Sequence, residues 1–385
     1  MGSVSALVGG GIVFGAYVHV AYNIRKKSQA KKNDPELIFH ANDQQDDARV
    51  RKIKKRVIHG RLIYGMYDRF NGKPEKECEE WWTRVHYHLL PLESILTKDE
   101  LHLYAKELQD ERNNKYFGVF RRNKERPSAE APDWVVAIRG TEPSAWADLQ
   151  NDYKIVVEKL NSSNLITILH AVVRRLGKEH GYCNVNVTGH SLGAAAGLLV
   201  CRRLALEGCL VEGHFFNPPF NTLESLARTC AHAVKRVMIK AFAAKGEKLY
   251  EAGKRFGRKV LNAEPDTDRR SRALAEFITL AEANWSPYLY VNKHDFVCCK
   301  FLSHFRKAIH GTVDEDRTKW YSSVNECSKK FLGETESFHL FPSAHLVMIE
   351  TPLLQPISAH KLWNWMDPHL SYEFMQAKLI PWPHT

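Results

Sequence analysis

A segment near the middle of the chain reads Val185-Asn186-Val187-Thr188-Gly189-His190-Ser191-Leu192-Gly193. Its first four residues alternate apolar and polar side chains, which is typical of a strand. Strong helix formers follow from Ala194 to Leu206, and Gly208 is suited to end that helix. The segment therefore predicts a strand, a sharp turn at Ser191 and a helix. In this setting a G-x-S-x-G pattern indicates a nucleophilic serine.

Two glycines flank the serine, each two residues away. A serine presented on a strained turn between a strand and a helix needs small neighbours, because the two backbones approach closely there. Gly189 and Gly193 meet this need, and Ala194, Ala195 and Ala196 extend the small surface. The alternative interpretation is a glycine-rich helix start in which Ser191 is an ordinary N-cap.

Other apolar runs on both sides of this segment predict further buried strands. Trp134 to Ile138 is a compact apolar run that ends at Arg139-Gly140-Thr141, and later candidates are 213–217, 288–292 and 346–349. Strands that alternate with helices predict a mostly parallel sheet covered on both faces. We therefore expect an α/β fold of the α/β-hydrolase type, with one main domain over residues 50–385.

A serine hydroxyl is a weak nucleophile until a histidine accepts its proton and a carboxylate orients that histidine. In the α/β-hydrolase fold the acid and then the histidine follow the serine along the chain. Asp295 lies three residues after the strand predicted to end at Asn292, where a loop could carry the acid. The alternative is an aspartate that only forms a turn.

The catalytic histidine is expected on a loop after the last core strand. His360 follows the strand predicted at 346–349 and fits best, with His345 as the second choice. Seven histidines lie beyond Asp295: His304, His310, His339, His345, His360, His369 and His384. Apart from His360 and His345, they are expected to be surface or structural residues.

The negative oxygen of a tetrahedral intermediate needs backbone N–H donors. In this fold one donor comes from the residue after the serine and a second from a loop after an earlier strand. Leu192 and Thr141 are the predicted donors.

Composition limits the classes of partner. The formal net charge is +11, which favours anionic partners such as a phospholipid surface or nucleic acid. The chain has no zinc-finger spacing, RRM signature or basic-zipper heptad, so we expect a membrane and no nucleic acid. The eight cysteines are scattered without metal-ligand spacing, and neither a metal nor an organic cofactor is expected.

The N-terminal residues predict a membrane anchor. Residues 1–24 contain no charged side chain, and 4–22 are apolar enough for a helix to cross a bilayer. Basic residues follow directly, so the catalytic domain would face the cytosol. A cleaved signal peptide and a buried or flexible tail are the alternatives.

The segment after the anchor, residues 25–49, reads as a polar linker. From Ala48 to Arg69 the helical spacing of apolar residues predicts a helix whose basic run is a solvated face.

A basic insert separates the strands predicted at 213–217 and 288–292. It spans 221–285, and between Asn221 and Arg272 it holds thirteen Lys and Arg against six Asp and Glu. The pattern fits a helical lid or cap that docks on anionic lipid, or else helices packed on the core with their basic faces in solvent.

Taken together, the motifs resemble the class 3, fungal-type triacylglycerol lipases and within them a plant lipase-like branch. The resemblance covers roughly Ile38 to the C-terminus and is carried by 138–141, 189–195, 216–220, 289–295, 339–344 and 359–363. It implies an ester hydrolase with a triad of Ser191, Asp295 and His360 and oxyanion donors at Thr141 and Leu192. Plant relatives often carry the label GDSL esterase or lipase, yet the chain contains no Gly-Asp-Ser-Leu.

The sequence therefore predicts a serine carboxylic-ester hydrolase that acts on acyl lipids and associates with a membrane. Two alternatives stay open. One is a lipase-like scaffold that has lost turnover and binds other proteins. The other keeps the chemistry but changes the acceptor, as in an acyltransferase or thioesterase.

Overall fold

The computed structural model describes most of the core of the chain. The described residues are 48–104, 116–123, 131–140, 165–219, 275–295, 297–299, 301–302, 305, 342–351 and 356–378. Several predicted features lie outside them: the anchor at 1–24, nearly all of the linker at 25–49, Thr141, and most of the insert at 221–285.

The described residues form one eight-stranded sheet in which the strands are neighbours in chain order. The five central strands, β3 to β7, run parallel, and antiparallel pairs form both edges. This mostly parallel sheet with helices on both faces confirms the predicted α/β fold. The strands are β1 (Tyr87–Leu90), β2 (Phe117–Arg122), β3 (Trp134–Ile138), β4 (Val185–His190), β5 (Glu212–Phe216), β6 (Tyr288–Asn292), β7 (Ser343–Ile349) and β8 (Glu373–Lys378).

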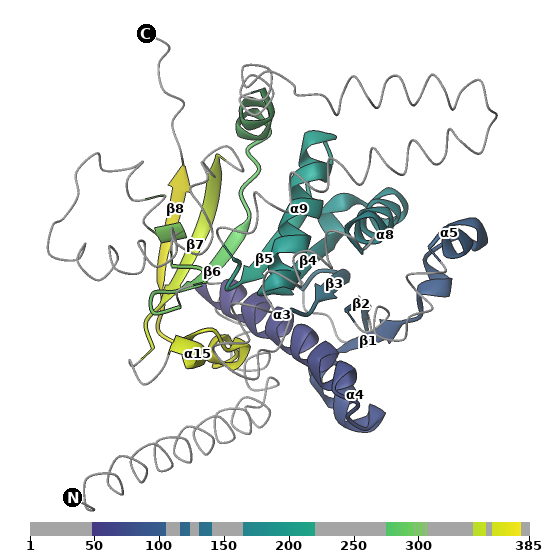
Figure 1. Cartoon of the computed structure of the whole chain (residues 1–385), viewed down its shortest axis with the longest axis horizontal. Helices are drawn as coiled ribbons and strands as arrows, with labels where there is room; N and C mark the ends of the chain where they lie inside the picture. Colours follow the sequence, from purple (N-terminus) through teal and green to yellow (C-terminus); the bar gives the residue numbers. More distant parts are fainter. Residues whose placement is uncertain are drawn as a thin grey trace, which may run out of the picture.

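Strand order explains which helices cover which face. Crossovers between parallel strands are right-handed, so crossovers that all step in one direction place their helices on the same face. Helix α8 (Leu165–His180) links β3 to β4, and α9 (Leu192–Leu206) links β4 to β5. Both pack in one apolar cluster, whereas α3 (Ala48–Phe70) belongs to a second cluster on the opposite face (Figure 1).

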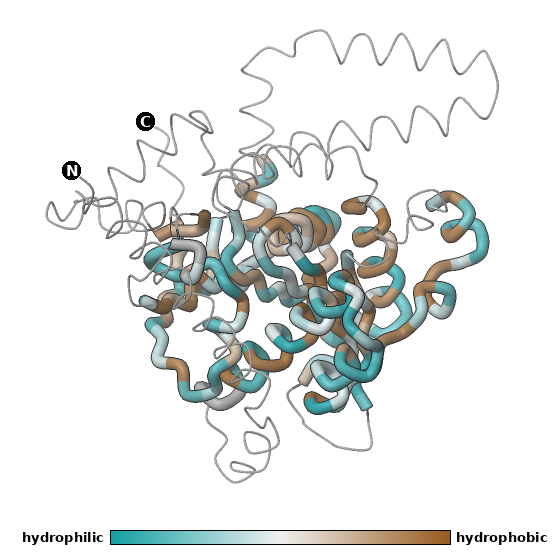
Figure 2. Tube along the Cα trace, turned by 60° about the horizontal axis from the view of Figure 1, so that its bottom comes forward, coloured by the Kyte–Doolittle hydropathy of each residue, from teal (hydrophilic) through white to brown (hydrophobic). Residues whose placement is uncertain are grey.

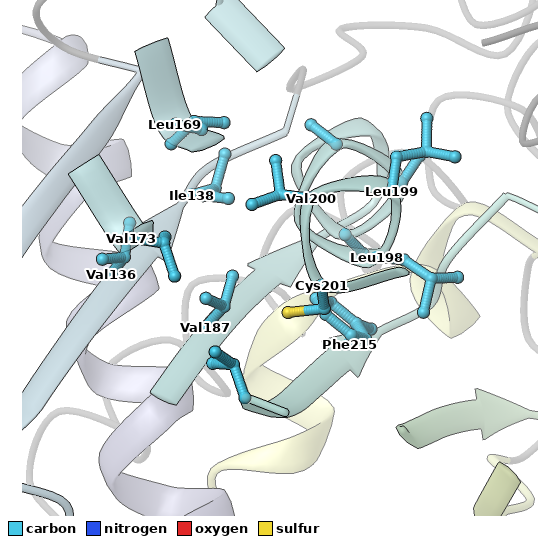
Figure 3. Packing of buried hydrophobic residues seen from close by; sticks show 14 of the residues in the cluster. Val136, Ile138, Leu169, Val173, Val187, Leu198, Leu199, Val200, Cys201 and Phe215 are labelled. Atoms are coloured by element: carbon cyan, nitrogen blue, oxygen red, sulfur yellow. The ribbon is translucent and has the colours of Figure 1, made fainter. Parts of the chain in front are cut away.

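Alternating residues of each strand feed the two clusters. In β3, Val136 and Ile138 face α8 and α9, while Val135 and Ala137 face α3. Val187 of β4 and Phe215 of β5 pack under α9 beside Val200 and Cys201 (Figure 3). Brown hydrophobic and teal hydrophilic residues alternate along the described helices, as expected for helices with one face on the sheet (Figure 2).

Helix α3 confirms the helix predicted from Ala48 but corrects the interpretation of its basic run as a solvated face. Lys54, Arg56 and Arg61 are buried, and Arg56 is only 1% exposed. The Arg56 guanidinium donates to the backbone carbonyls of Trp365 and Asp367. Burial lowers the pKa of Arg56 to about 10. Spacing predicted the apolar stripe, but long basic side chains also reach into the core where carbonyl acceptors satisfy them.

The remaining described elements are short. Helix α5 begins with a capping box, in which Thr97 and Glu100 satisfy each other's backbone N–H groups. These elements are α4 (Glu75–Thr83), η1 (Leu92–Ser94), α5 (Lys98–Leu103), η3 (Tyr182–Asn184), α15 (Pro356–Ala359) and η4 (Leu362–Trp365).

In the part of the chain that the structure describes, no helix has both the length and the apolar character needed to cross a membrane. Near the end of the predicted insert, residues 275–282 are helical, and Phe277 and Leu280 are buried against the cluster under α8 and α9. At this end, therefore, the insert packs on the core.

Candidate active site

The turn at Ser191 has the strained backbone that the sequence predicted. Ser191 has φ of 54° and ψ of −125°, lies between β4 and α9, and is 2% exposed. Its N–H donates to the carbonyl of Phe216 at the end of β5, at 2.9 Å. Its side chain makes no capping hydrogen bond to the helix, which excludes an ordinary N-cap. A non-glycine residue in this conformation requires support from its surroundings, and such strain is concentrated at functional sites.

The flanking glycines are required by close backbone contacts. A Cβ atom on Gly193 would lie 2.5 Å from the carbonyl oxygens of Ile138 and Arg139 at the end of β3. A Cβ on Gly189 would collide with the backbone of Gly193. The turn is thus packed directly against the neighbouring strand, as the G-x-S-x-G pattern predicted.

Asp295 lies in the loop after β6, and its carboxylate is fully buried. Its Oδ1 accepts from the backbone N–H of Val297 at 3.0 Å. Its Oδ2 accepts from the Asn217 amide and from the Cys298 thiol, the latter at 3.2 Å. The bond from Val297 closes a local turn, whereas Asn217 reaches the carboxylate from the loop after β5. Asp295 therefore forms the turn and also receives a donor from a distant part of the chain.

His360 follows α15 and pairs with Asp295. Its Nδ1 donates to Asp295 Oδ2 at 2.7 Å, and its side chain is almost completely buried. Because Nδ1 carries the proton, Nε2 of the neutral ring has a free lone pair. This Nε2 is buried and has no hydrogen-bond partner among the described residues. The geometry thus leaves one imidazole nitrogen able to accept a proton.

The electrostatics keep the acid ionised. Burial alone would raise the pKa of Asp295, but attraction to His360 and hydrogen bonds from His360, Asn217 and the Val297 N–H outweigh it. The net effect lowers the pKa of Asp295. The carboxylate is therefore available at neutral pH to hold the Nδ1 proton of His360 and to stabilise an imidazolium.

Two asparagines that the sequence analysis did not single out fix the loop before His360. Asn217 and Asn292 both donate from their side-chain amides to the carbonyl of Ala359, at 3.2 and 2.9 Å. Asn217 Oδ1 accepts from the indole N–H of Trp365. Asn217 lies in the Phe216-Asn217-Pro218-Pro219 motif and Asn292 ends β6, so both occur at strand ends, where polar residues after an apolar run are a usable signal.

Ser191, Asp295 and His360 follow strands that are neighbours or near neighbours, and they lie at the same end of the sheet. The ring of His190, next to Ser191, donates from Nε2 to the backbone carbonyl of His360 at 2.8 Å. Leu192 is the first residue of α9, as an oxyanion donor would require. Thr141 lies outside the described residues, but Gly140 before it is described. A Cβ on Gly140 would lie 2.8 Å from Cβ of Ser191.

The second-choice histidine lies elsewhere. His345 is in β7 opposite Tyr288, the first residue of β6, whereas Asp295 comes after the last residue of that strand. Its ring stacks on Tyr288 with centroids 4.5 Å apart. His345 is therefore at the opposite end of the sheet. The ring of His294 donates from Nδ1 to the backbone carbonyl of Thr351, and His369 is exposed. The other candidates, His304, His310, His339 and His384, lie outside the described residues.

The chain is similar in sequence to a plant protein. A GDSL esterase/lipase of Arabidopsis thaliana is 26% identical to this chain over 249 residues, which are 63% of this chain and 69% of that protein. No family model matches the chain, and no solved structure matches it. The similarity supports a lipase-like hydrolase, while membership of the class 3 lipases stays a prediction.

Within the described residues, no group of three or more His, Cys, Asp or Glu is arranged to hold a metal ion.

Proposed function

We propose that the chain is a serine carboxylic-ester hydrolase that acts on acyl lipids. The observation that carries the proposal is the combination at one end of the sheet: a strained serine turn beside an Asp295–His360 pair whose Nε2 is unpaired among the described residues. The similarity to an esterase/lipase gives independent support for ester chemistry.

The reaction follows from these groups. His360 Nε2 accepts the Ser191 hydroxyl proton as Oγ attacks the ester carbonyl carbon. The tetrahedral intermediate expels the alcohol, which takes the proton from His360, and an acyl-serine remains. Water then attacks the acyl-serine while His360 accepts one of its protons, and the carboxylic acid leaves as Ser191 recovers its hydrogen.

The negative oxygen of each intermediate would be held by backbone N–H groups. Leu192 supplies one from the first turn of α9, where the helix dipole also favours negative charge. Thr141 supplies the second in this proposal. Gly140, directly before it, lies against Ser191 and brings the loop after β3 to the nucleophile.

We further propose that the chain works at a membrane, through residues 4–24 and the basic insert at 221–285. The support is the uncharged apolar N-terminal segment and the excess of Lys and Arg in the insert. Flotation with anionic vesicles tests the insert: changing its Lys and Arg residues to Glu should reduce the bound fraction. Unaltered flotation would exclude docking by the insert.

Activity-based labelling tests the chemistry. Wild-type protein should react covalently with a fluorophosphonate probe and hydrolyse a series of acyl esters, whereas Ser191→Ala should abolish both. Ser343→Ala is a matched control, because it also removes a buried hydroxyl, one that donates to the Trp285 carbonyl at 2.9 Å at the opposite end of the sheet. It should label normally.

The outcomes separate the proposal from its alternatives. Equal labelling of wild type and Ser191→Ala would remove Ser191 from the mechanism. Labelling that depends on Ser191 without release of acid from any ester, but with transfer to an added alcohol or thiol, would indicate an acyltransferase. Neither labelling nor turnover in folded protein would indicate a scaffold without catalytic activity.

A further inference from the structure

A chain of three hydrogen bonds joins the loops that carry the proposed catalytic groups. The backbone N–H of Gly140 donates to the hydroxyl of Tyr67, at 2.9 Å. That hydroxyl lies 2.8 Å from Nδ1 of His190, and His190 Nε2 lies 2.8 Å from the carbonyl oxygen of His360. The chain thus runs from the loop after β3, through α3 and the serine turn, to the loop of the catalytic histidine.

The direction of each bond in this chain is fixed by chemistry. A carbonyl oxygen only accepts, so His190 Nε2 must carry the proton that reaches His360. Burial first, and then the nearby His360, lowers the pKa of His190 to about 3, so its ring is neutral and Nδ1 is an acceptor. The Tyr67 hydroxyl therefore donates to His190 and accepts from Gly140, which leaves no freedom to reverse the network.

The Gly140 peptide is held from its other side as well. The guanidinium of Arg139 donates to the Gly140 carbonyl at 2.7 Å. That guanidinium lies over two aromatic rings, 3.3 Å from the centroid of Phe70 and 4.4 Å from that of Tyr116. Tyr67 on the N–H and Arg139 on the carbonyl together fix the orientation of Gly140 immediately before the proposed oxyanion donor.

We propose that Tyr67 is a positioning residue for hydrolysis, which holds Gly140, the Ser191 turn and the His360 loop in register through His190. The inference rests on the proposed function for its catalytic meaning. Tyr67 acts through Gly140 and His190 and needs no contact with the substrate. Displacing reacting groups by about 1 Å is enough to reduce a rate about 100-fold, so a network that fixes three loops at once has a large effect on kcat.

The network also explains the identity of the residue before the serine. Position 190 needs a side chain that donates at its far end and accepts from Tyr67 nearer the backbone, while it stays uncharged in a buried site. A neutral histidine meets all three needs, and glutamine at this position would keep the donor toward His360 but lose the ring acceptor.

The test compares full-length wild type with Tyr67→Phe, His190→Gln and the double variant. Tyr87→Phe is the matched control, because the buried Tyr87 hydroxyl donates to the Pro132 carbonyl at 2.6 Å on the edge strand β1. Each protein is labelled with ¹⁵N-histidine for NMR. The rates of fluorophosphonate labelling and of hydrolysis of a p-nitrophenyl acyl ester are measured in parallel.

We expect Tyr67→Phe to lower kcat and the labelling rate about 10- to 100-fold with KM nearly unchanged. The double variant should be no slower than the slower single variant, because both changes interrupt the same chain. The NMR signals should assign Nε2–H to His190 and Nδ1–H to His360, and Tyr67→Phe should shift both rings. Tyr87→Phe should leave the rates and both rings unaltered.

Two results would overturn the inference. One is a His360 signal unaltered by Tyr67→Phe, because the loops would then not be coupled through His190. The other is wild-type kinetics in folded Tyr67→Phe. If Tyr67→Phe does not fold, His190→Gln takes its place, and its His360 NMR signal and its kinetics test the inference in the same way. Failure of wild type to label at all would instead reject the proposed function, and the NMR comparison would still decide whether Tyr67 couples the loops.

Discussion

The two ends of the sheet carry nearly the same set of polar side chains, yet only one of them also has the strained serine turn of the proposed active site. At one end His360 pairs with Asp295 at 2.7 Å, and Tyr67 bonds to His190. At the other end His214 of β5 pairs with Glu212, also at 2.7 Å, and Tyr290 bonds to His214 at 2.9 Å. A carboxylate, a histidine and a tyrosine therefore do not by themselves indicate an active site.

The difference lies in which ring nitrogens are occupied. His214 uses both: Nε2 donates to Glu212 and Nδ1 accepts from Tyr290. Its ring is stacked between His59 and Tyr288, with centroids 4.2 and 4.6 Å away. His360 keeps Nε2 unpaired among the described residues, at the end of the sheet where a serine occupies a strained turn. His214 therefore has no ring nitrogen left to accept a proton, whereas His360 has one beside the serine turn.

The largest expected effect comes from replacing the two carboxylates in turn. Asp295→Asn should lower kcat about 10,000-fold, because its amide would donate to His360 Nδ1 and leave the proton on the nitrogen that must accept. Glu212→Gln should change kcat by less than about twofold, since its partner histidine takes no part in the reaction. Ester hydrolysis by the two purified variants measures both effects.

Glu212→Gln is expected to affect the stability of the protein and not its activity. Glu212→Gln replaces an ionised acceptor for Lys55 and His214 by a neutral one and should lower the free energy of unfolding by about 1–2 kcal/mol. Urea unfolding measures this free energy. The same experiment on Asp295→Asn checks that this variant is folded. Equal losses of activity in both variants would contradict the distinction between the two ends.

A smaller effect is expected from acid, because buried neutral histidines at both ends of the sheet make the free energy of unfolding depend on pH. Burial lowers the folded-state pKa of His190 to about 3, and burial with the neighbouring His214 lowers that of His59 well below its usual range. The unfolded chain binds these protons near pH 6.5, so stability is lost as the pH falls below about 6.5. Each such histidine contributes up to about 1.4 kcal/mol per pH unit.

Urea unfolding between pH 7 and pH 5 measures this dependence. His59→Phe should reduce the slope of unfolding free energy against pH, because one buried proton acceptor is removed from the Glu212 end. His369→Phe is a suitable control, since His369 is exposed. A slope that His59→Phe leaves unchanged would mean that His59 stays neutral in the unfolded chain or charged in the folded one.

The sequence predicted the parts of the fold and site that depend on local pattern. Apolar runs located the five parallel strands, β3 to β7, to within a few residues, and the small residues around Ser191 predicted the turn. The antiparallel edge strands β1, β2 and β8 were not predicted. Asp295 and His360 were selected because chain order and strand ends restrict where such groups can lie, and the structure brings these two together.

The parts that depend on distant contacts left little local signal. Tyr67 and Arg56 lie on a helix whose spacing indicated only an apolar stripe, and their partners are 123 and 309 residues away along the chain. The basic run therefore read as solvated, although carbonyl groups of a distant loop make its burial possible. The polar network around His214 was missed for the same reason, since its members come from α3, β4, β5 and β6.

Helix α3 also sets an order for assembly during synthesis. It leaves the ribosome before any strand that it covers, yet the acceptors for its buried Arg56 are the carbonyls of Trp365 and Asp367 near the end of the chain. Until those residues emerge, a guanidinium destined for the interior has no protein acceptor. The buried contacts of α3 with the sheet therefore cannot be completed until residues 365–367 have been synthesised.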